Sequence, residues 1–432
     1  MIFGLSWMVN RNREIFFELL LPTFFVHLTR GLLLTTLPYF VLNNLGRSET
    51  EVGMAVGAIG LGKMLIDVPG GMMLGFLGAR KLMIICGAVI SSSSLLMLTV
   101  SWYVQSFALV VIAMFLMGAG EGIGIISRLS QVSDDVAMAE RGRVSALLGG
   151  SSRLAMALGP LLSLILATTT SSSSPNGSVF ILQIFFSLVS VILVLLVPKV
   201  HRPPGHETTQ SKRTSNTLSK DSIRNLAIIS VFMLIFQIAR ECRKLLIPLA
   251  GVQAGYRLQD LSYLTTASFT IDAILFFAAG VLMDQLGNNF TGVISLAILT
   301  LSLLVVVPGT TLIALALHAV LAGIGNGLSS GIAVAFGADL APPGPPRSKF
   351  IGLFRLCTDA GELIGPVLVG LVSQYASTPT MINVIACTGI FGIFWIIRLA
   401  PAEAKFCYKS SPSITPNVPL GHALGNKSDP KE

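Results

Sequence analysis

The sequence predicts an all-α membrane protein in which twelve transmembrane helices form two pseudo-symmetric six-helix bundles. Composition is the first reason: 53% of the 432 residues are hydrophobic and only 12% are charged, whereas a soluble domain has about 25% charged residues. An internal repeat is the second reason, because the apolar run from Phe17 to Leu195 is matched by the run from Ala227 to Ile396. Two copies of a six-helix unit are typical of secondary transporters.

The repeat keeps its register in polar and small residues, so shared hydrophobicity does not explain it. Arg30 with Pro38 recurs as Arg240 with Pro248, and the offset between the halves stays between 205 and 210 residues. The halves are therefore parallel copies of one unit. Four regions are expected along the chain: an N-terminal bundle at 1–198, a cytoplasmic linker at 199–223, a C-terminal bundle at 224–400 and a disordered cytoplasmic tail at 401–432.

Twelve apolar segments have roughly the 20 residues that a helix needs to cross the hydrocarbon core of a bilayer. They lie near residues 15–41, 50–75, 80–101, 104–128, 143–167, 178–198, 224–250, 259–286, 291–308, 311–336, 349–373 and 380–398. The basic stretch Arg11–Arg13 leads into a span that is too long for the apolar core of a signal peptide, so we expect no cleavage there.

Lysines and arginines are distributed unevenly between the loops. With the N-terminus in the cytoplasm, 19 of the 29 basic residues fall in cytoplasmic segments, eight fall in helices and only Arg47 and Arg257 fall on the far side. This distribution follows the positive-inside rule, so we expect both termini in the cytoplasm. The glycosylation sequon at Asn176 then lies on the far side. The net charge of +8 needs no nucleic acid partner to explain it.

The motifs of enzymes and metalloproteins are missing from the sequence. The five cysteines show neither a disulfide framework nor the spacing of metal ligands, and there is no phosphate-binding loop or nucleophile motif. We therefore expect no enzymatic activity, no metal and no cofactor. The expected partners are the lipid bilayer, a small-molecule substrate and, as a candidate, protons.

Several short motifs lie within the predicted helices and in the loops between them. They are GMMLGFLGARK from Gly71 to Lys81, GVLMDQLG from Gly280, the spacing of Asp67 with Pro69 and Gly71, GIGNGLSSG from Gly323, and GADLAPP from Gly337. On these motifs the chain resembles the major facilitator superfamily over essentially its whole membrane region. The last two resemble an exporter-like, drug:proton antiporter-type branch whose substrates are mostly unassigned. The resemblance implies transport by alternating access, with helices 1, 4, 7 and 10 lining the cavity and helices 2, 5, 8 and 11 between the halves. We also expect a monomer.

The two loop motifs depart from the family pattern in opposite ways. The first has Gly75 where an aspartate is usual, whereas the second keeps Asp284 but lacks the usual basic residues. A carboxylate is stabilised near the positive N-terminal end of a helix. We therefore expect Asp284 to contact the start of the fifth span near Arg141 and Arg143; the alternative is a solvated loop carboxylate.

Two further family signatures are only partly kept. Met114 stands where proton-coupled exporters of the family have an arginine in the fourth helix, and this helix has Glu121 and Arg128 instead. The antiporter signature of the fifth helix is half kept at Gly159-Pro160, and the eleventh helix has a fuller version around Gly365-Pro366. Glycines let helices approach closely and proline can kink a helix. These helices are therefore expected to bend, which favours export.

Charged residues inside the predicted spans are the candidates for function. A charged side chain at the bilayer centre costs at least about 2.5 to 3.5 kcal/mol, so such residues usually face a cavity or a partner. The near balance of eight basic and seven acidic residues indicates internal pairing. The basic residues are Arg30, Lys63, Arg128, Arg153, Arg240, Arg243, Lys244 and Arg355, and the acidic residues are Glu18, Asp67, Glu121, Glu241, Asp272, Asp359 and Glu362.

Spacing groups some of these charges. Lys63 with Asp67, and Arg355 with Asp359, are four residues apart, so each pair shares a helical face. The seventh predicted span, called helix 7, differs. Its three cations Arg240, Arg243 and Lys244 lie within about one turn of each other, and only Glu241 is adjacent. Carboxylates from other helices or an anionic ligand must compensate these three charges.

The candidate residues fall into three expected roles. Substrate binding is expected for Arg30, Glu121, Arg240, Arg243 and Lys244, with structural pairing as the alternative for Arg30 and Arg240. Proton coupling is expected for Asp67, Glu121 or Asp272, because burial favours the neutral carboxylic acid unless a cation is adjacent. Gating or interface packing is expected for Lys63, Gly71, Gly78, Arg80, Arg141, Arg143, Arg153, Gly159, Pro160, Asp284, Asp359, Glu362, Gly365 and Pro366.

These features predict a secondary transporter for a small organic solute, with an anionic or zwitterionic substrate favoured and proton-coupled efflux as the first hypothesis. Uniport or import of an organic metabolite is the alternative mode of transport. A non-transporting receptor or scaffold is a third hypothesis, and the many charges kept inside the helices count against it.

Overall fold

The computed structural model describes residues 16–136, 141–169, 176–196, 218–342 and 346–399, and every regular element in these ranges is helical. The predicted all-α fold class is confirmed. The predicted tail at 401–432 and the predicted linker up to residue 217 lie outside the described residues.

Six helical spans make up the first half of the described chain, and short π-helical turns extend two of them. They are η1–α3–η2 (Phe16–Leu20, Leu21–Tyr39 and Phe40–Asn44), α4 (Glu49–Leu77), α5–η3 (Ala79–Thr99 and Val100–Val104), α6 (Phe107–Asp135), α7 (Arg141–Thr169) and α8 (Asn176–Leu196). Local sequence sets the start of α4, where the Ser48 side chain accepts from the Glu51 backbone N–H and the Glu51 side chain accepts from the Ser48 backbone N–H. Such a capping box satisfies two N–H groups that a helix start leaves free.

Six spans also make up the second half. They are α9 (Lys220–Gln253), α10 (Leu258–Leu286), α11 (Asn288–Leu304), α12 with α13 (Leu312–Leu328 and Ile332–Leu340), α14 (Pro346–Tyr375) and α15 (Thr378–Leu399). Of the twelve spans in the described residues, eleven are long and apolar enough to cross a membrane, and α11 is a shorter apolar helix.

One predicted span proves to be two helices. The tenth segment was expected as one helix over 311–336, but α12 ends at Leu328 and α13 begins at Ile332. The hydroxyl of Ser329 donates to the Asn326 carbonyl oxygen at 2.7 Å, so it competes with the helical backbone bonds. Gly331 then takes a φ of +85°, a conformation that glycine adopts without steric cost.

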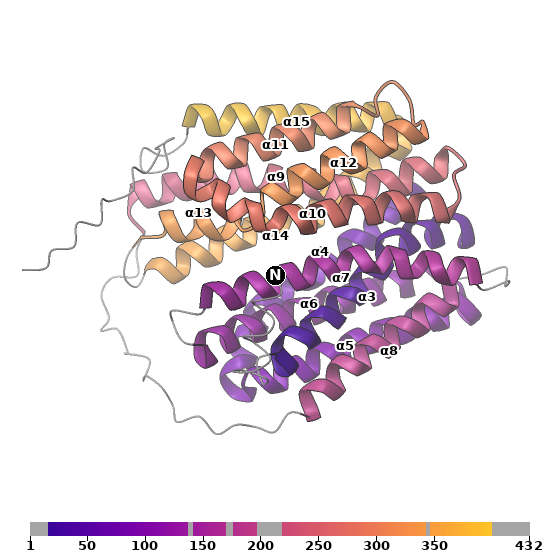
Figure 1. Cartoon of the computed structure of the whole chain (residues 1–432), viewed down its shortest axis with the longest axis horizontal. Helices are drawn as coiled ribbons and strands as arrows, with labels where there is room; N and C mark the ends of the chain where they lie inside the picture. Colours follow the sequence, from indigo (N-terminus) through magenta and orange to yellow (C-terminus); the bar gives the residue numbers. More distant parts are fainter. Residues whose placement is uncertain (1–15, 137–140, 170–175, 197–217, 343–345, 400–432) are drawn as a thin grey trace, which may run out of the picture.

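The helices are arranged in two groups that follow the halves of the sequence. In Figure 1, α3 to α8 lie in the lower group and α9 to α15 in the upper group. Between the groups, α4 packs against α14 and α7 packs against α10. These are helices 2, 11, 5 and 8, which were expected to form the interface between the halves.

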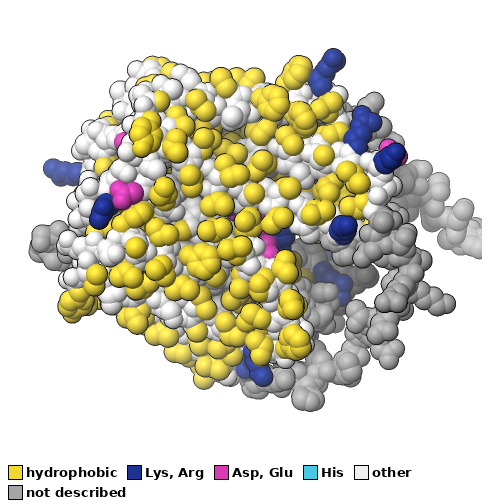
Figure 2. All heavy atoms as spheres, turned by 180° about the vertical axis from the view of Figure 1, so that it is seen from behind, with side chains coloured by type: hydrophobic (Ala, Val, Ile, Leu, Met, Phe, Trp, Pro, Cys, Tyr) yellow, Lys and Arg dark blue, Asp and Glu magenta, His cyan; other side chains and the backbone are white. Residues whose placement is uncertain are grey.

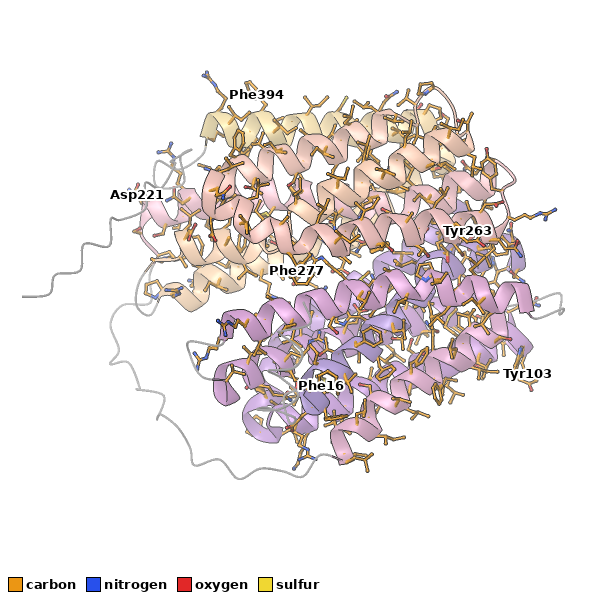
Figure 3. All side chains as sticks on the ribbon, in the orientation of Figure 1. Phe16, Tyr103, Asp221, Tyr263, Phe277 and Phe394 are labelled. Atoms are coloured by element: carbon orange, nitrogen blue, oxygen red, sulfur yellow. The ribbon has the colours of Figure 1, made fainter. Side chains whose placement is uncertain are left out.

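The outer surface is apolar, as a lipid-facing surface must be. Figure 2 shows hydrophobic side chains over most of one face, with basic side chains gathered mainly toward its two ends. Among the exposed residues are Phe76, Ile274, Ile313 and Phe394, and Phe394 points outward from α15 in Figure 3. An apolar surface of this extent would not be stable in water.

We call the side of the membrane region with the start of α9 and the end of α15 the terminal side, and the other the distal side. Asp221 lies at the terminal side, and Tyr103 and Tyr263 lie at the distal side (Figure 3). At the distal side, polar contacts join the halves: the Thr50 N–H donates to Gln374 Oε1 at 3.3 Å, and the Gln253 amide of α9 donates to Glu49 of α4.

The two halves diverge at the terminal side. A Cβ added to Gly53 of α4 would lie 2.4 Å from the Pro366 carbonyl oxygen of α14, so the two backbones are in direct contact there. Gly71 lies on the same face of α4, because 18 residues make five turns, yet nothing lies within 4 Å of its Cβ position. The interface between α4 and α14 is therefore closed at the distal side and open at the terminal side.

Candidate functional site

Most charged side chains inside the membrane region gather in two clusters at matching positions of the two halves. We call the set Arg30, Lys63, Glu121 and Glu362 the N-cluster, and the set Arg153, Arg240, Arg243, Asp272 and Asn326 the C-cluster. Each cluster combines three helices of one half with one interface helix of the other: α3, α4, α6 and α14 for the first, and α9, α10, α12 and α7 for the second.

The N-cluster is a closed network of ion pairs. Arg30 contacts Glu121 Oε2 through Nη1 and Glu362 Oε1 through Nη2, both at 3.5 Å. Lys63 Nζ lies 2.6 Å from Glu362 Oε2. Two cations thus meet two carboxylates, and Glu362 reaches in from the other half of the molecule. The pairing of Arg30 with Glu121, which was the structural alternative for this arginine, is the arrangement that the structure adopts.

In the C-cluster, one carboxylate receives several donors. Asp272 Oδ1 accepts from Arg153 Nε at 3.2 Å, and Asp272 Oδ2 accepts from Arg243 Nη2 at 3.2 Å and from Asn326 Nδ2 at 2.5 Å. Arg153 comes from α7, so this contact also joins the halves. With Arg240, which does not contact Asp272, the cluster has three arginines and a single aspartate, so it carries two positive charges in excess.

In the described residues, the groups that bind Arg240 are neutral. Its Nε donates to Asn326 Oδ1 at 2.8 Å and its Nη2 donates to Ser329 Oγ at 3.0 Å. The Phe236 ring centroid lies 5.3 Å from its guanidinium carbon, within the range of a cation–π contact. Within the part of the chain that the structure describes, no carboxylate pairs with this arginine.

Lys244, the third cation of helix 7, is paired within its own helix. Its Nζ lies 2.5 Å from Glu241 Oε1, which also accepts from the Gln237 amide at 3.1 Å. A cavity of about 20 Å³ lies between Arg30 and Lys244, bounded by Leu37 and Pro38. That volume holds one water molecule but no organic solute.

A third group of charges joins α4 to α14 between the N-cluster and the open end of this interface, because Asp67 lies between Lys63 and Gly71 on α4. Arg355 Nε lies 3.6 Å from Asp67 Oδ2 and 3.4 Å from Asp359 Oδ2. The shared helical face of Arg355 and Asp359 therefore carries an ion pair. Lys63 and Asp67 also share a face, but each of them pairs with a residue of α14 instead.

The contact expected for Asp284 is not formed, so this prediction was wrong for the conformation described. Asp284 is exposed at the end of α10, Arg143 is exposed on α7, and the described residues contain no ion pair between Asp284 and either Arg141 or Arg143. Arg141 Nε donates instead to the Val136 carbonyl oxygen at 3.0 Å. The physical reason is the opening at the terminal side: nothing lies within 4 Å of the Cβ position of Gly280, one turn earlier on α10.

The glycines and prolines of the interface signatures permit close helix packing. A Cβ on Gly159 of α7 would lie 2.2 Å from the Gly31 backbone of α3, and one on Gly365 of α14 would lie 2.9 Å from the Glu241 Cβ of α9. Pro160 and Pro366 both lie inside their helices. Gly78, the residue immediately before α5, has a φ of +77°, and Arg80 donates to the Val194 carbonyl oxygen at 2.7 Å.

Asn326 and Ser329 are the site residues that the sequence analysis missed. Both lie in the GIGNGLSSG motif, and Asn326 occupies the repeat position of Glu121 at an offset of 205 residues. The repeat register was therefore the signal that could have identified Asn326. Ser329 lies in the turn after α12, which hydropathy does not reveal.

Comparison with known proteins gives the family. The model of the major facilitator superfamily matches residues 19–240 and 229–427. Among curated proteins, no significant sequence match is found.

Solved structures of the same fold include a mutant form of the nucleoside transporter NupG, at 13% identity, covering 89% of this chain and 99% of that one, with a TM-score of 0.73. A D-xylose-proton symporter is similar at 14% identity, covering 94% and 99%, with a TM-score of 0.71. The human organic anion transporter MFSD10 (TETRAN) is similar at 15% identity, covering 89% and 99%, with a TM-score of 0.61. Because the family model covers nearly the whole chain, this multi-pass membrane transporter belongs to the major facilitator superfamily.

Proposed function

We propose that the protein is a secondary active transporter that exports a small organic anion, or a zwitterion with an anionic group, in exchange for protons. The excess positive charge of the C-cluster is the observation that carries this proposal. Arg243 is 3% exposed and the Arg153 side chain is 19% exposed, so water compensates only part of that charge. A carboxylate or similar oxyanion on the solute would supply the missing negative charge.

Arg240 is the residue that best fits the anionic group. Among the described residues its guanidinium donates to the neutral acceptors Asn326 and Ser329, and it is partly exposed. The planar guanidinium can give two parallel hydrogen bonds to an oxyanion. Arg243 lies one turn further along α9 and adds positive charge. Arg30 and Lys244, by contrast, already have carboxylate partners, so their roles in this proposal are to hold the helices that line the path.

The carboxylates differ in how well they could hold a proton. Both oxygens of Asp272 accept hydrogen bonds, whereas Glu121 Oε1 and Asp67 Oδ1 are buried without a hydrogen-bond partner. A proton on Glu121 would weaken its attraction to Arg30, which links α3 with α14 through Glu362. We therefore favour Glu121 as the coupling residue, with Asp67 next and Asp272 last.

The ion pairs between the halves are suited to a gate. Three of these pairs join helices that must change their contacts when the binding site closes on one side of the membrane and opens on the other. They are Glu362 with Lys63, Asp272 with Arg153, and Asp67 with Arg355. In this proposal both termini are cytoplasmic and the protein works as a monomer with bundles at 1–198 and 224–400. The conformation described is then open toward the cytoplasm.

Purified protein in proteoliposomes tests the proposal. An imposed proton gradient is applied, lumenal pH is recorded, and hydrophilic carboxylates, phosphates, zwitterions and amines are added in turn. Proton flux driven by anionic or zwitterionic compounds, lost in Arg240→Gln and largely kept in Arg240→Lys, is the expected result.

Other outcomes separate the alternatives. Labelled anions that equilibrate without proton movement would indicate a uniporter, and flux only with amines would reject the anion site. If the folded protein shows neither proton flux nor equilibration of labelled anions, transport would be rejected and a receptor or scaffold favoured.

A further inference from the structure

The N-terminal half contains a buried cation that neither cluster uses. Arg128 of α6 is 8% exposed, and its Nη1 atom is buried without a hydrogen-bond partner. Within the described residues, it forms no ion pair with a carboxylate. It lies seven residues, or two turns, on the terminal side of Glu121 and on nearly the same face of α6.

Local packing directs this guanidinium back along α6 toward the centre of the membrane region. Its Nη1 lies 3.6 Å from the Cβ position of Gly124, one turn earlier on the helix, and Cys86 Sγ of α5 lies 2.8 Å from the same point. A side chain at position 124 would collide with Cys86. The glycine therefore leaves the space beside Cys86 through which the arginine extends toward Glu121.

The charged groups of the described residues compensate Arg128 only in part. Glu121, the nearest carboxylate on the same helix, already pairs with Arg30, and Glu362 already pairs with Arg30 and Lys63. Two further ionisable groups lie within electrostatic reach: the buried Cys86 thiol of α5, and His27 of α3, whose Nδ1 donates to the Thr23 carbonyl oxygen at 2.8 Å. A buried charge without a partner is strongly destabilising, so its presence indicates a ligand of opposite charge.

We propose that Arg128 forms a second binding site for an oxyanion, a carboxylate or phosphate group of a small solute, on the terminal side of the N-cluster. The inference deepens the proposed function and rests on it for the identity of the solute: an anion from the terminal side binds at Arg128 on its way to Arg240. The two sites lie on different halves, so rocking of the halves would separate them.

The number of anions bound per chain tests the inference. Purified full-length protein is dialysed to equilibrium against labelled lactate in one arm and labelled inorganic phosphate in the other, which distinguishes the two oxyanion classes. The wild type should bind two anions per chain in at least one arm, Arg128→Gln and Arg240→Gln should each bind one, and the double variant should bind none. Arg47→Gln, a change at an exposed arginine, should still bind two.

Thermal unfolding supplies a second measurement on the same variants. Because Arg128→Gln removes an uncompensated charge, its midpoint in anion-free buffer should be at or above that of the wild type, and its anion-dependent stabilisation should be smaller. Arg128→Met replaces it if the glutamine variant is poorly recovered.

The possible failures are distinguishable. Two anions bound by Arg128→Gln, or one bound by the wild type and lost only in Arg240→Gln, would overturn this inference and leave the proposed function standing. One anion lost in Arg128→Gln, with no change in Arg240→Gln, would overturn the site assigned to Arg240. No binding to the wild type in either arm would reject both.

Discussion

The N-cluster and the C-cluster occupy matching positions of the repeat but differ in charge balance. In the first, the helix from the other half brings a carboxylate, Glu362; in the second, it brings a cation, Arg153. The neighbour on the fourth helix of each half also differs, because Glu121 pairs with Arg30 whereas Asn326 binds Arg240 without a charge. The duplicated scaffold thus holds a self-contained ion network in one half and an excess of positive charge in the other.

Breaking the N-cluster should have the largest effect on stability. Glu362→Gln leaves Arg30 and Lys63 buried without the carboxylate that they share, and removing one partner of a buried ion pair costs about 3 to 5 kcal/mol. The measurement is the free energy of unfolding of the purified protein in denaturant. Arg47→Gln is the control, because the exposed pair Arg47–Glu51 contributes at most about 1 kcal/mol. Equal unfolding midpoints for the two variants would show that the N-cluster does not stabilise the fold.

Making the C-cluster resemble the N-cluster should remove anion binding. Asn326→Glu places a carboxylate beside Arg240 in the position that Glu121 has beside Arg30. We expect binding of labelled lactate or phosphate at this site to weaken about 100-fold, or about 2.8 kcal/mol, because the new side chain competes with the ligand. Asn326→Gln keeps a neutral amide and serves as the control. Unchanged affinity in Asn326→Glu would mean that Arg240 does not hold the anion.

A second comparison concerns the two ends of α4. Gly53→Ala should destabilise the protein by about 1 to 3 kcal/mol, the usual cost of overpacking, because the new Cβ would lie 2.4 Å from the Pro366 carbonyl oxygen. Gly71→Ala meets nothing within 4 Å and should be neutral or stabilising by up to about 1 kcal/mol through helix propensity. Unfolding free energies of the two variants measure the difference. The opposite order would mean that α4 and α14 are closed at the terminal side and open at the distal side.

Much of the fold could be predicted from the sequence because a bilayer imposes one simple rule on helix length and polarity. Apolar length located twelve spans, and the repeat register related the two halves. The break between α12 and α13 was not predicted, because it depends on the Ser329 hydroxyl and on the positive φ of Gly331. Neither feature changes the hydropathy of the segment.

The site was harder to predict because ion pairs between helices depend on helix rotation. Spacing along one helix suggested that Lys63 and Asp67 belong together, and both turned out to pair with α14. The cations of helix 7 were recognised, but which of them lacks a carboxylate depends on Asp272 and Glu241, and only the packing of the helices decides it. Arg128 was visible as an intramembrane charge, although the sequence could not show that it forms no ion pair with a carboxylate of the described residues.

The smallest expected effect compares two aspartates of α10. Asp284→Asn should change the free energy of unfolding by no more than about 0.5 kcal/mol, because Asp284 is exposed and has no ion-pair partner in the described residues. Asp272→Asn, about 18 Å away along the same helix, should cost several kcal/mol, because Asp272 accepts from Arg153 and Arg243. Unfolding in denaturant measures both. A loss of more than about 1 kcal/mol in Asp284→Asn would mean that Asp284 spends time in contact with a cation such as Arg141, as it would if the terminal side closes. The contact between Asp284 and the start of the fifth span that the sequence predicts would then belong to that closed state.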